Sequence, residues 1–168
     1  MSTKLLVLGL GNIILKDEGV GVHVANAIKE RYTFSPDVEI VDGGTLGLDL
    51  LPLFEGREKI LIIDAVYFGK DPGHIGVLLN DEIPSSLSAK LSVHHIGLAD
   101  VLFAAKLKDL MPSEIALVGI QPEIIGEFGL EMTGTVKGKL EEMVDRAIEI
   151  LKGWNVTCVL RSPLGSSA

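Results

Sequence analysis

Residues 4–32 read KLLVLGLGNIILKDEGVGVHVANAIKERY. After the leading lysine, residues 5–10 form an uninterrupted apolar run, which is typical of a strand that is buried on both faces of a sheet. A turn rich in glycine and polar residues follows. Residues 20–32 then place apolar side chains at spacings of three and four, which predicts a helix. A buried strand, a tight turn and a helix are the opening of a β-α-β unit, so this stretch favours an α/β fold with a parallel sheet.

The rest of the chain continues the alternation of strands and helices. Strands are predicted at residues 37–42, 59–65, 73–79 and 114–120, and helices at residues 46–54, 94–107 and 135–154. Glycines in the strand at 73–79 suit a sheet edge, and Pro52 is expected to kink its helix. We therefore expect one α/β domain over residues 1–160, built as a three-layer sandwich, followed by a flexible tail over residues 161–168.

The charge and cysteine content exclude several classes of protein. The formal net charge is −8 at pH 7 and no basic stripe offsets it, which argues against nucleic acid and anionic membranes as partners. No stretch approaches the roughly 18 consecutive apolar residues that a membrane span needs. The one cysteine, Cys158, excludes an internal disulfide and suits a reducing compartment. We expect a cytoplasmic protein.

Three groups of polar residues are predicted to meet at the sheet edge where ligands bind in α/β folds, beyond the carboxyl ends of the strands. Asp17 and Glu18 follow the first strand, Asp64 ends the third, and His94 and His95 begin the third predicted helix. Taken singly, these acids are more typical of helix caps and turns. Together, Glu18, Asp64 and one histidine would offer two oxygens and a nitrogen to a metal ion, with positions left open for water or substrate. Such a set suits nickel, zinc or another first-row ion.

The segment Asp42-Gly43-Gly44-Thr45 leaves the same edge of the predicted sheet. Consecutive glycines allow another chain to approach closely, which makes these four residues candidate substrate contacts, although a tight turn explains them equally well. Other catalytic schemes find no support, since the chain has neither a G-x-S-x-G elbow nor an H-E-x-x-H helix.

A nucleotide-binding oxidoreductase is the main alternative, because a Gly9-x-Gly11 motif stands at the end of the first strand and Asp42 ends the second. The dinucleotide fingerprint needs a third glycine where this chain has Ile14. In addition, Asp17 and Glu18 would compete with a phosphate for the helix amino terminus. The residues therefore argue against a nucleotide cofactor.

Four segments in order resemble the hydrogenase maturation endopeptidases. They are GLGNIILKDEGVG at residues 9–21, DGGT at 42–45, IDA at 63–65 and HHIGLAD at 94–100. The resemblance extends from residue 4 to about residue 150. It implies a twisted, mostly parallel five-stranded sheet flanked by helices. It also implies a metal site formed by Glu18, Asp64 and His94, where His94 holds the motif position two residues after Ser92. One departure is Gly134, which stands where the family has a proline.

The resemblance further implies a hydrolase, an endopeptidase similar to the aspartic type, that acts on the large-subunit precursor of a [NiFe]-hydrogenase. After nickel has entered the precursor, the enzyme removes its C-terminal extension. Nickel would then be carried by the precursor rather than held tightly by the free enzyme. Residues 42–45 would contact the substrate near the cut, and no catalytic residue beyond the metal ligands is implied. A non-catalytic, nickel-dependent maturation chaperone is a further alternative.

Overall fold

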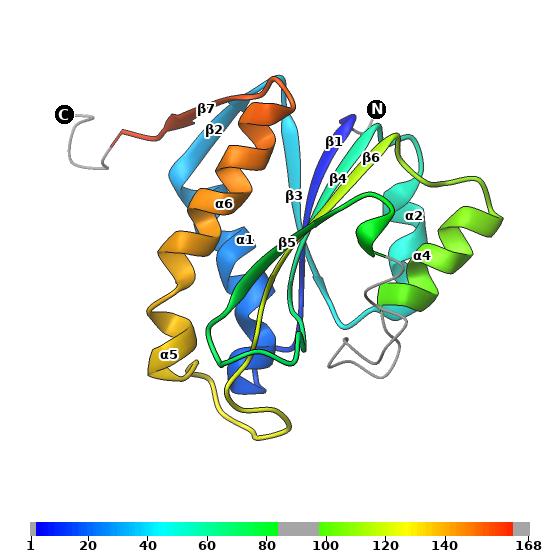
Figure 1. Ribbon diagram of the computed structural model, residues 1–168. Helices are drawn as coiled ribbons and strands as arrows, with labels where there is room; N and C mark the ends of the chain where they lie inside the picture. The colour runs from blue at the N-terminus through cyan, green and yellow to red at the C-terminus, as the bar shows by residue number, and fades with distance from the viewer. Residues whose placement is uncertain (1–2, 84–97, 163–168) are drawn as a thin grey trace.

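The structure is a computed structural model that describes residues 3–83 and 98–162. A twisted five-stranded sheet lies at its centre, with the strand order β3-β1-β4-β6-β5 (Figure 1). Its strands are β1 (Leu5–Leu10), β3 (Val38–Gly44), β4 (Lys59–Ala65), β5 (Ile75–Leu79) and β6 (Glu114–Ile120). Strands β1, β3, β4 and β6 run parallel to one another, and β5 pairs antiparallel with β6 at the edge of the sheet. The mostly parallel five-stranded sheet is therefore confirmed.

Helices cover both faces of this sheet and complete the three-layer sandwich (Figure 1). One layer consists of α1 (Val20–Arg31), α5 (Gly134–Lys137) and α6 (Leu140–Gly153), and the other of the 3-10 turn η2 (Gly47–Leu50), α2 (Leu51–Phe54) and α4 (Leu98–Leu107). Along β1, the side chain of Val7 packs in the core under α1 and α6, whereas Leu6 and Leu8 pack in the core under α2 and α4. Covering both faces explains why the central strands are continuously apolar.

Two predicted helices differ in detail from the observed elements. Pro52 lies in the first turn of α2, where the missing N–H costs no hydrogen bond, so the expected kink is wrong. The predicted helix at 135–154 is two helices, because α5 ends at Lys137 and α6 begins only at Leu140. Strand β3 also runs on through Gly44 instead of ending at Asp42, since Leu10 pairs with Gly44 across a register shift.

A second, two-stranded sheet was not predicted. It pairs β2 (Tyr32–Ser35) antiparallel with β7 (Thr157–Leu160) beside the sandwich (Figure 1). Cys158 lies half-buried in this ribbon opposite Phe34, and burial raises the pKa of its thiol. The backbone N–H of Arg161 extends the pairing to the carbonyl of Arg31, at 2.7 Å. Residues 163–168 of the predicted tail lie outside the described residues.

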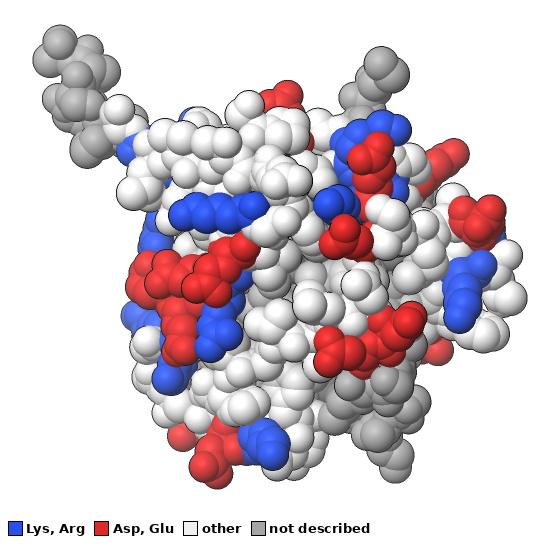
Figure 2. Space-filling view, turned by 45° about the horizontal axis from the view of Figure 1, so that its top comes forward, with Lys and Arg blue, Asp and Glu red and all other residues white. Residues whose placement is uncertain are grey.

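The surface carries charges of both signs close together. Figure 2 shows acidic and basic side chains mixed over the face that it presents. At the start of α6, for example, the N-cap residue Lys139 and Arg146 approach the carboxylate of Glu142 to 3.3 and 4.0 Å. Within residues 3–83 and 98–162, no helix is long and apolar enough to cross a bilayer.

The glycines of the first motif allow α1 to lie directly on the sheet. A Cβ atom at Gly21 would stand 2.1 Å from the carbonyl oxygen of Ile63 and 2.3 Å from that of Leu10. A Cβ at Gly9 would stand 2.6 Å from the Cβ of Ala25. This close approach also sets the position of the short 3-10 turn η1 (Lys16–Gly19), which precedes α1 and carries two of the candidate site residues.

We expect Gly21→Ala to lower the free energy of unfolding by about 2–3 kcal/mol, because the added methyl group meets backbone atoms of two strands that cannot move aside. Urea denaturation followed by circular dichroism measures this loss. Gly134→Ala is the matched control, since a Cβ there meets nothing within 4 Å. If the two variants unfold at the same urea concentration, the proposed close packing of α1 is wrong.

Candidate functional site

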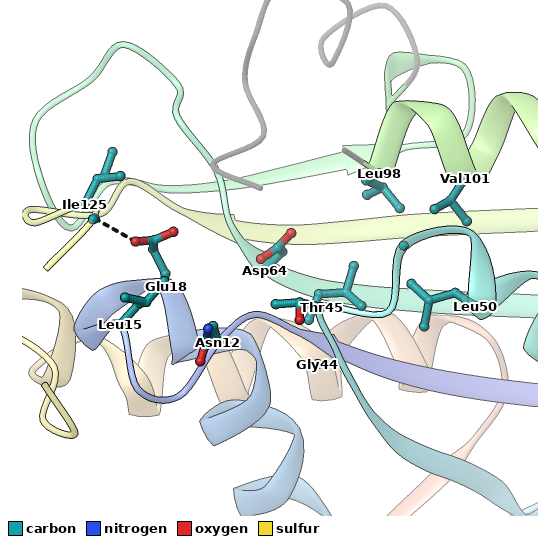
Figure 3. Close-up of a pocket in the computed structure, with 13 residues that line it drawn as sticks. Asn12, Leu15, Glu18, Gly44, Thr45, Leu50, Asp64, Leu98, Val101 and Ile125 are labelled. Carbon is teal, nitrogen blue, oxygen red and sulfur yellow. Dashed lines mark hydrogen bonds between the residues drawn. The ribbon is translucent and has the colours of Figure 1, made fainter. Parts of the chain in front are cut away.

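A pocket of about 530 Å³ opens at the carboxyl ends of β1 and β4. From β1 the chain crosses to β3 on one side, and β4 is the neighbour on the other side, so the strand order reverses at this point. Such reversals are where α/β sheets bind ligands. The lining residues are Leu10, Asn12, Leu15, Glu18, Gly44, Thr45, Gly47, Leu50, Asp64, Leu98, Val101, Ile125 and Gly126 (Figure 3).

Two of the three predicted metal ligands share this pocket. Glu18 enters from η1 and Asp64 from the end of β4, and both carboxylates project into the pocket (Figure 3). Their exposed fractions are only 4% and 2%. The Oε2 atom of Glu18 accepts the N–H of Gly126 at 2.7 Å, and Oδ1 of Asp64 accepts the N–H of Ala65 at 2.8 Å. Two nearly buried carboxylates facing one cavity suit a cation.

The third predicted ligand, His94, and its neighbour His95 lie outside the described residues. Leu98, which begins α4 four positions after His94, lines the same pocket as the two carboxylates. Within the described part of the chain, no three histidine, cysteine, aspartate or glutamate side chains are grouped closely enough to hold a metal ion. The described residues therefore contribute two oxygen donors to the candidate site, and its nitrogen donor stays a prediction.

Asp17 does not cap a helix, although helix capping is the more typical role of such an acid. Neither η1 nor α1 has a side-chain cap. The side chain of Asp17 is fully buried, and its Oδ2 atom accepts the backbone N–H groups of Glu123 and Ile124 at 3.0 and 3.1 Å. Its Oδ1 atom accepts the N–H of Thr133 at 2.8 Å, and the Thr133 hydroxyl also donates to the carboxylate. Asp17 thus holds the loop of residues 121–133, which we call the site loop.

The site loop is also joined to the segment that precedes η1. The N–H of Lys16 donates to the carbonyl of Gly129 at 3.0 Å, and the N–H of Gly129 donates to the carbonyl of Ile14 at 2.8 Å. The ammonium group of Lys16 lies 2.9 Å from the carboxylate of Glu127. Gly126 of this loop in turn donates its N–H to Glu18. The bonds that hold the loop therefore also position the carboxylate of Glu18 in the pocket, although the loop and Glu18 are more than 100 residues apart in sequence.

Gly134, where the sequence departs from the resemblance, begins α5. Thr133 is the N-cap of α5, and its hydroxyl accepts the N–H of Val136 at 3.4 Å. Gly134 is the first residue of the helix, a position where proline is favoured because its fixed φ suits the helix and its missing N–H costs nothing. The replacement therefore keeps the cap of α5 and lacks only the rigidity of the proline ring.

Of the four predicted substrate contacts, Gly44 and Thr45 line the pocket. Asp42 supports the turn, since its Oδ1 atom accepts the N–H of Gly44 at 2.9 Å. Gly43 is buried, and a Cβ there would approach the side chains of Leu8, Leu10 and Leu50 within 3.0 Å. Asp42 and Gly43 thus shape the segment, and Gly44 and Thr45 face the cavity.

The two other histidines, His23 and His74, do not line the pocket. His23 of α1 is half-buried and its Nε2 atom has no hydrogen-bond partner. Burial lowers the pKa of His23, and the nearby charge of Asp42 partly offsets this by raising it. His74 contacts the ring of Phe68 edge-on, with 5.6 Å between centroids.

Comparisons with known proteins identify one family. The family model described as hydrogenase maturation protease matches residues 22–150. The hydrogenase 2 maturation protease of Escherichia coli strain K12 is 36% identical over 162 residues, which cover 96% of this chain and 98% of the relative. The hydrogenase expression/formation protein HupD of Bradyrhizobium diazoefficiens is 36% identical over 166 residues, covering 98% of this chain and 86% of the relative.

Solved structures agree with these matches. The hydrogenase maturating endopeptidase HybD of E. coli superimposes with a TM-score of 0.87 at 36% identity, covering 95% of this chain and 98% of its own. The [NiFe] hydrogenase maturation protease HybD of Thermococcus kodakarensis superimposes with a TM-score of 0.73 at 29% identity, covering 88% and 99%. The family model, the relatives and the fold agree, and the chain belongs to the hydrogenase maturation proteases.

Proposed function

We propose that this endopeptidase recognises nickel in a [NiFe]-hydrogenase large-subunit precursor through Glu18, Asp64 and His94, and then removes the C-terminal extension of the precursor. The observation that carries the proposal is the pair of nearly buried carboxylates, Glu18 and Asp64, in one pocket at the reversal of strand order. Two carboxylates attract a divalent cation strongly where water is scarce, and an imidazole with carboxylates is a donor set that suits nickel.

The position of His94 in the chain is compatible with this ligand set. Four residues of extended chain span at most about 14 Å, and His94 precedes the pocket residue Leu98 by four positions. The hydrogen bond from Gly126 occupies one oxygen of Glu18 and fixes the orientation of the carboxylate, which leaves the second oxygen for a ligand bond.

In this scheme nickel belongs to the substrate. An empty precursor would lack the bond to the three side chains, so the enzyme would process only precursors that have received nickel. Gly44 and Thr45 line the pocket next to the carboxylates, and we propose that the segment Asp42–Thr45 contacts the substrate beside the bond that is cut.

Incubation of the purified protein with a nickel-loaded and a nickel-free precursor tests the proposal. We expect mass spectrometry to show a shortened large subunit only in the nickel-loaded sample. If the loaded precursor binds but keeps its full length, the chain is a chaperone. Tight binding of NAD or NADP in a titration would support the oxidoreductase alternative instead.

The assignment of the nitrogen ligand makes a separate prediction. His94→Ala is expected to slow processing by roughly 100-fold or more, since ligand loss removes the directional bond to the metal. His95→Ala is expected to retain much of the activity. The initial rate of precursor shortening measures both effects, with thermal unfolding as the control for folding. An active His94 variant and an inactive His95 variant would reverse the assignment.

A further inference from the structure

Large apolar side chains are exposed beside the candidate site. They are Ile13, Ile14, Ile125, Phe128 and Leu130, with exposed fractions of 44%, 45%, 46%, 78% and 72%. We call these five residues the apolar patch. The core of the fold is built from other residues, so packing of the described chain does not account for the patch. Contiguous exposed apolar side chains are a mark of interaction sites.

The two parts of the patch are neighbours in space because their backbones are bonded to each other. Phe128 and Leu130 flank Gly129, whose N–H donates to the carbonyl of Ile14 at 2.8 Å. The patch also joins the candidate site. Ile125 lines the pocket, and the next residue, Gly126, donates its N–H to Glu18 (Figure 3).

The patch is held in place before any partner arrives. Asp17 binds the site loop at both of its ends, through the N–H groups of Glu123 and Thr133. The ion pair between Lys16 and Glu127, at 2.9 Å, adds a bond in the middle. A loop that is already ordered loses little conformational entropy when it binds, so a larger share of the contact energy appears as affinity.

Resting on the proposed function, we infer that the apolar patch docks an apolar segment of the hydrogenase precursor while the bond to be cut lies at the pocket. When apolar side chains of the precursor pack against Phe128 and Leu130, the apolar surfaces of both partners leave the water. This burial contributes the favourable free energy of binding. Glu123 and Glu131 are exposed acids of the same loop, and the chain carries a net charge of −8. A segment with basic rather than acidic residues beside its apolar ones therefore fits this surface. The patch thus selects the precursor by the residues around the cut, independently of the metal.

The test is the double variant Phe128→Ser/Leu130→Ser, assayed with the nickel-loaded precursor. We expect KM for the precursor to rise about tenfold or more, as for the loss of central apolar contacts in an interface, while kcat stays within about threefold of the wild type. Phe103→Ser/Leu107→Ser on α4 is the matched control, because these side chains are 65% and 73% exposed and do not line the pocket. Its KM is expected to equal that of the wild type.

An unchanged KM in the patch variant overturns the inference, and so does an equal rise in the control variant. Sedimentation equilibrium tests whether the apolar patch binds a second copy of the chain instead of the precursor. If the wild type is a dimer, and the patch variant is a monomer with unchanged KM, the patch binds another copy of the chain and the inference is wrong. Failure of the wild type to cleave would instead contradict the proposed function. In that case the Kd for the intact precursor is measured for the wild type, the patch variant and the control variant. A tenfold rise in the patch variant alone supports docking.

Discussion

Glu18→Gln and Asp64→Asn are each expected to slow cleavage of the nickel-loaded precursor by roughly 100-fold or more. Each substitution keeps the size of the side chain and removes a negative charge from a pocket wall where the exposed fraction is 4% or less. The neutral amide is a poor ligand for nickel, so under the proposed function the nickel of the precursor would no longer be held by this side chain. The rate of precursor shortening at fixed enzyme concentration measures the loss.

The same substitutions are expected to change the free energy of unfolding by less than about 1 kcal/mol, since removing one of two carboxylates that face one cavity relieves repulsion. Glu141→Gln is the matched control, because its carboxylate lies 2.6 Å from Arg31 on the surface, with 69% of the side chain exposed. It is expected to process at the wild-type rate. Near-normal cleavage by either pocket variant would show that the carboxylate is not a ligand.

Asp17→Ala is expected to lower the free energy of unfolding by about 3–5 kcal/mol and to reduce processing strongly. The substitution leaves the backbone N–H groups of Glu123, Ile124 and Thr133 and the Thr133 hydroxyl without their acceptor. Each unsatisfied buried donor costs about 1–3 kcal/mol, and opening of the loop to water recovers part of that cost. Urea denaturation measures the stability, and amide hydrogen exchange at Gly126 measures the release of the loop from Glu18.

Thr133→Val separates the contribution of the Thr133 hydroxyl from that of the Asp17 carboxylate. It removes the hydroxyl but keeps the N–H that donates to Asp17 at 2.8 Å, so we expect a smaller loss of about 1–2 kcal/mol that includes the cap of α5. An Asp17→Ala variant that unfolds at the wild-type urea concentration would mean that the site loop does not depend on this carboxylate.

The order of elements could be predicted because the chain buries its sheet on both faces. Residues 60–63 and 115–120 are apolar without a break, and they form the buried parts of β4 and β6. The ribbon of β2 and β7 was missed for the opposite reason. Its four-residue strands are largely exposed and pair residues 122 to 128 positions apart, so neither length nor periodicity identifies them.

The sequence by itself determined that two acids, Glu18 and Asp64, stand at the carboxyl ends of buried strands, because a parallel sheet brings those ends to one edge. Only the tertiary structure decided what Asp17, the neighbour of Glu18, does. In sequence either acid could cap the helix, and Glu18 alone was predicted to be a metal ligand. In the fold, Glu18 faces the pocket and Asp17 is turned into the protein, where backbone N–H groups 106 to 116 residues away satisfy its charge. A buried carboxylate must find donors, and which donors it meets depends on where distant loops come to lie.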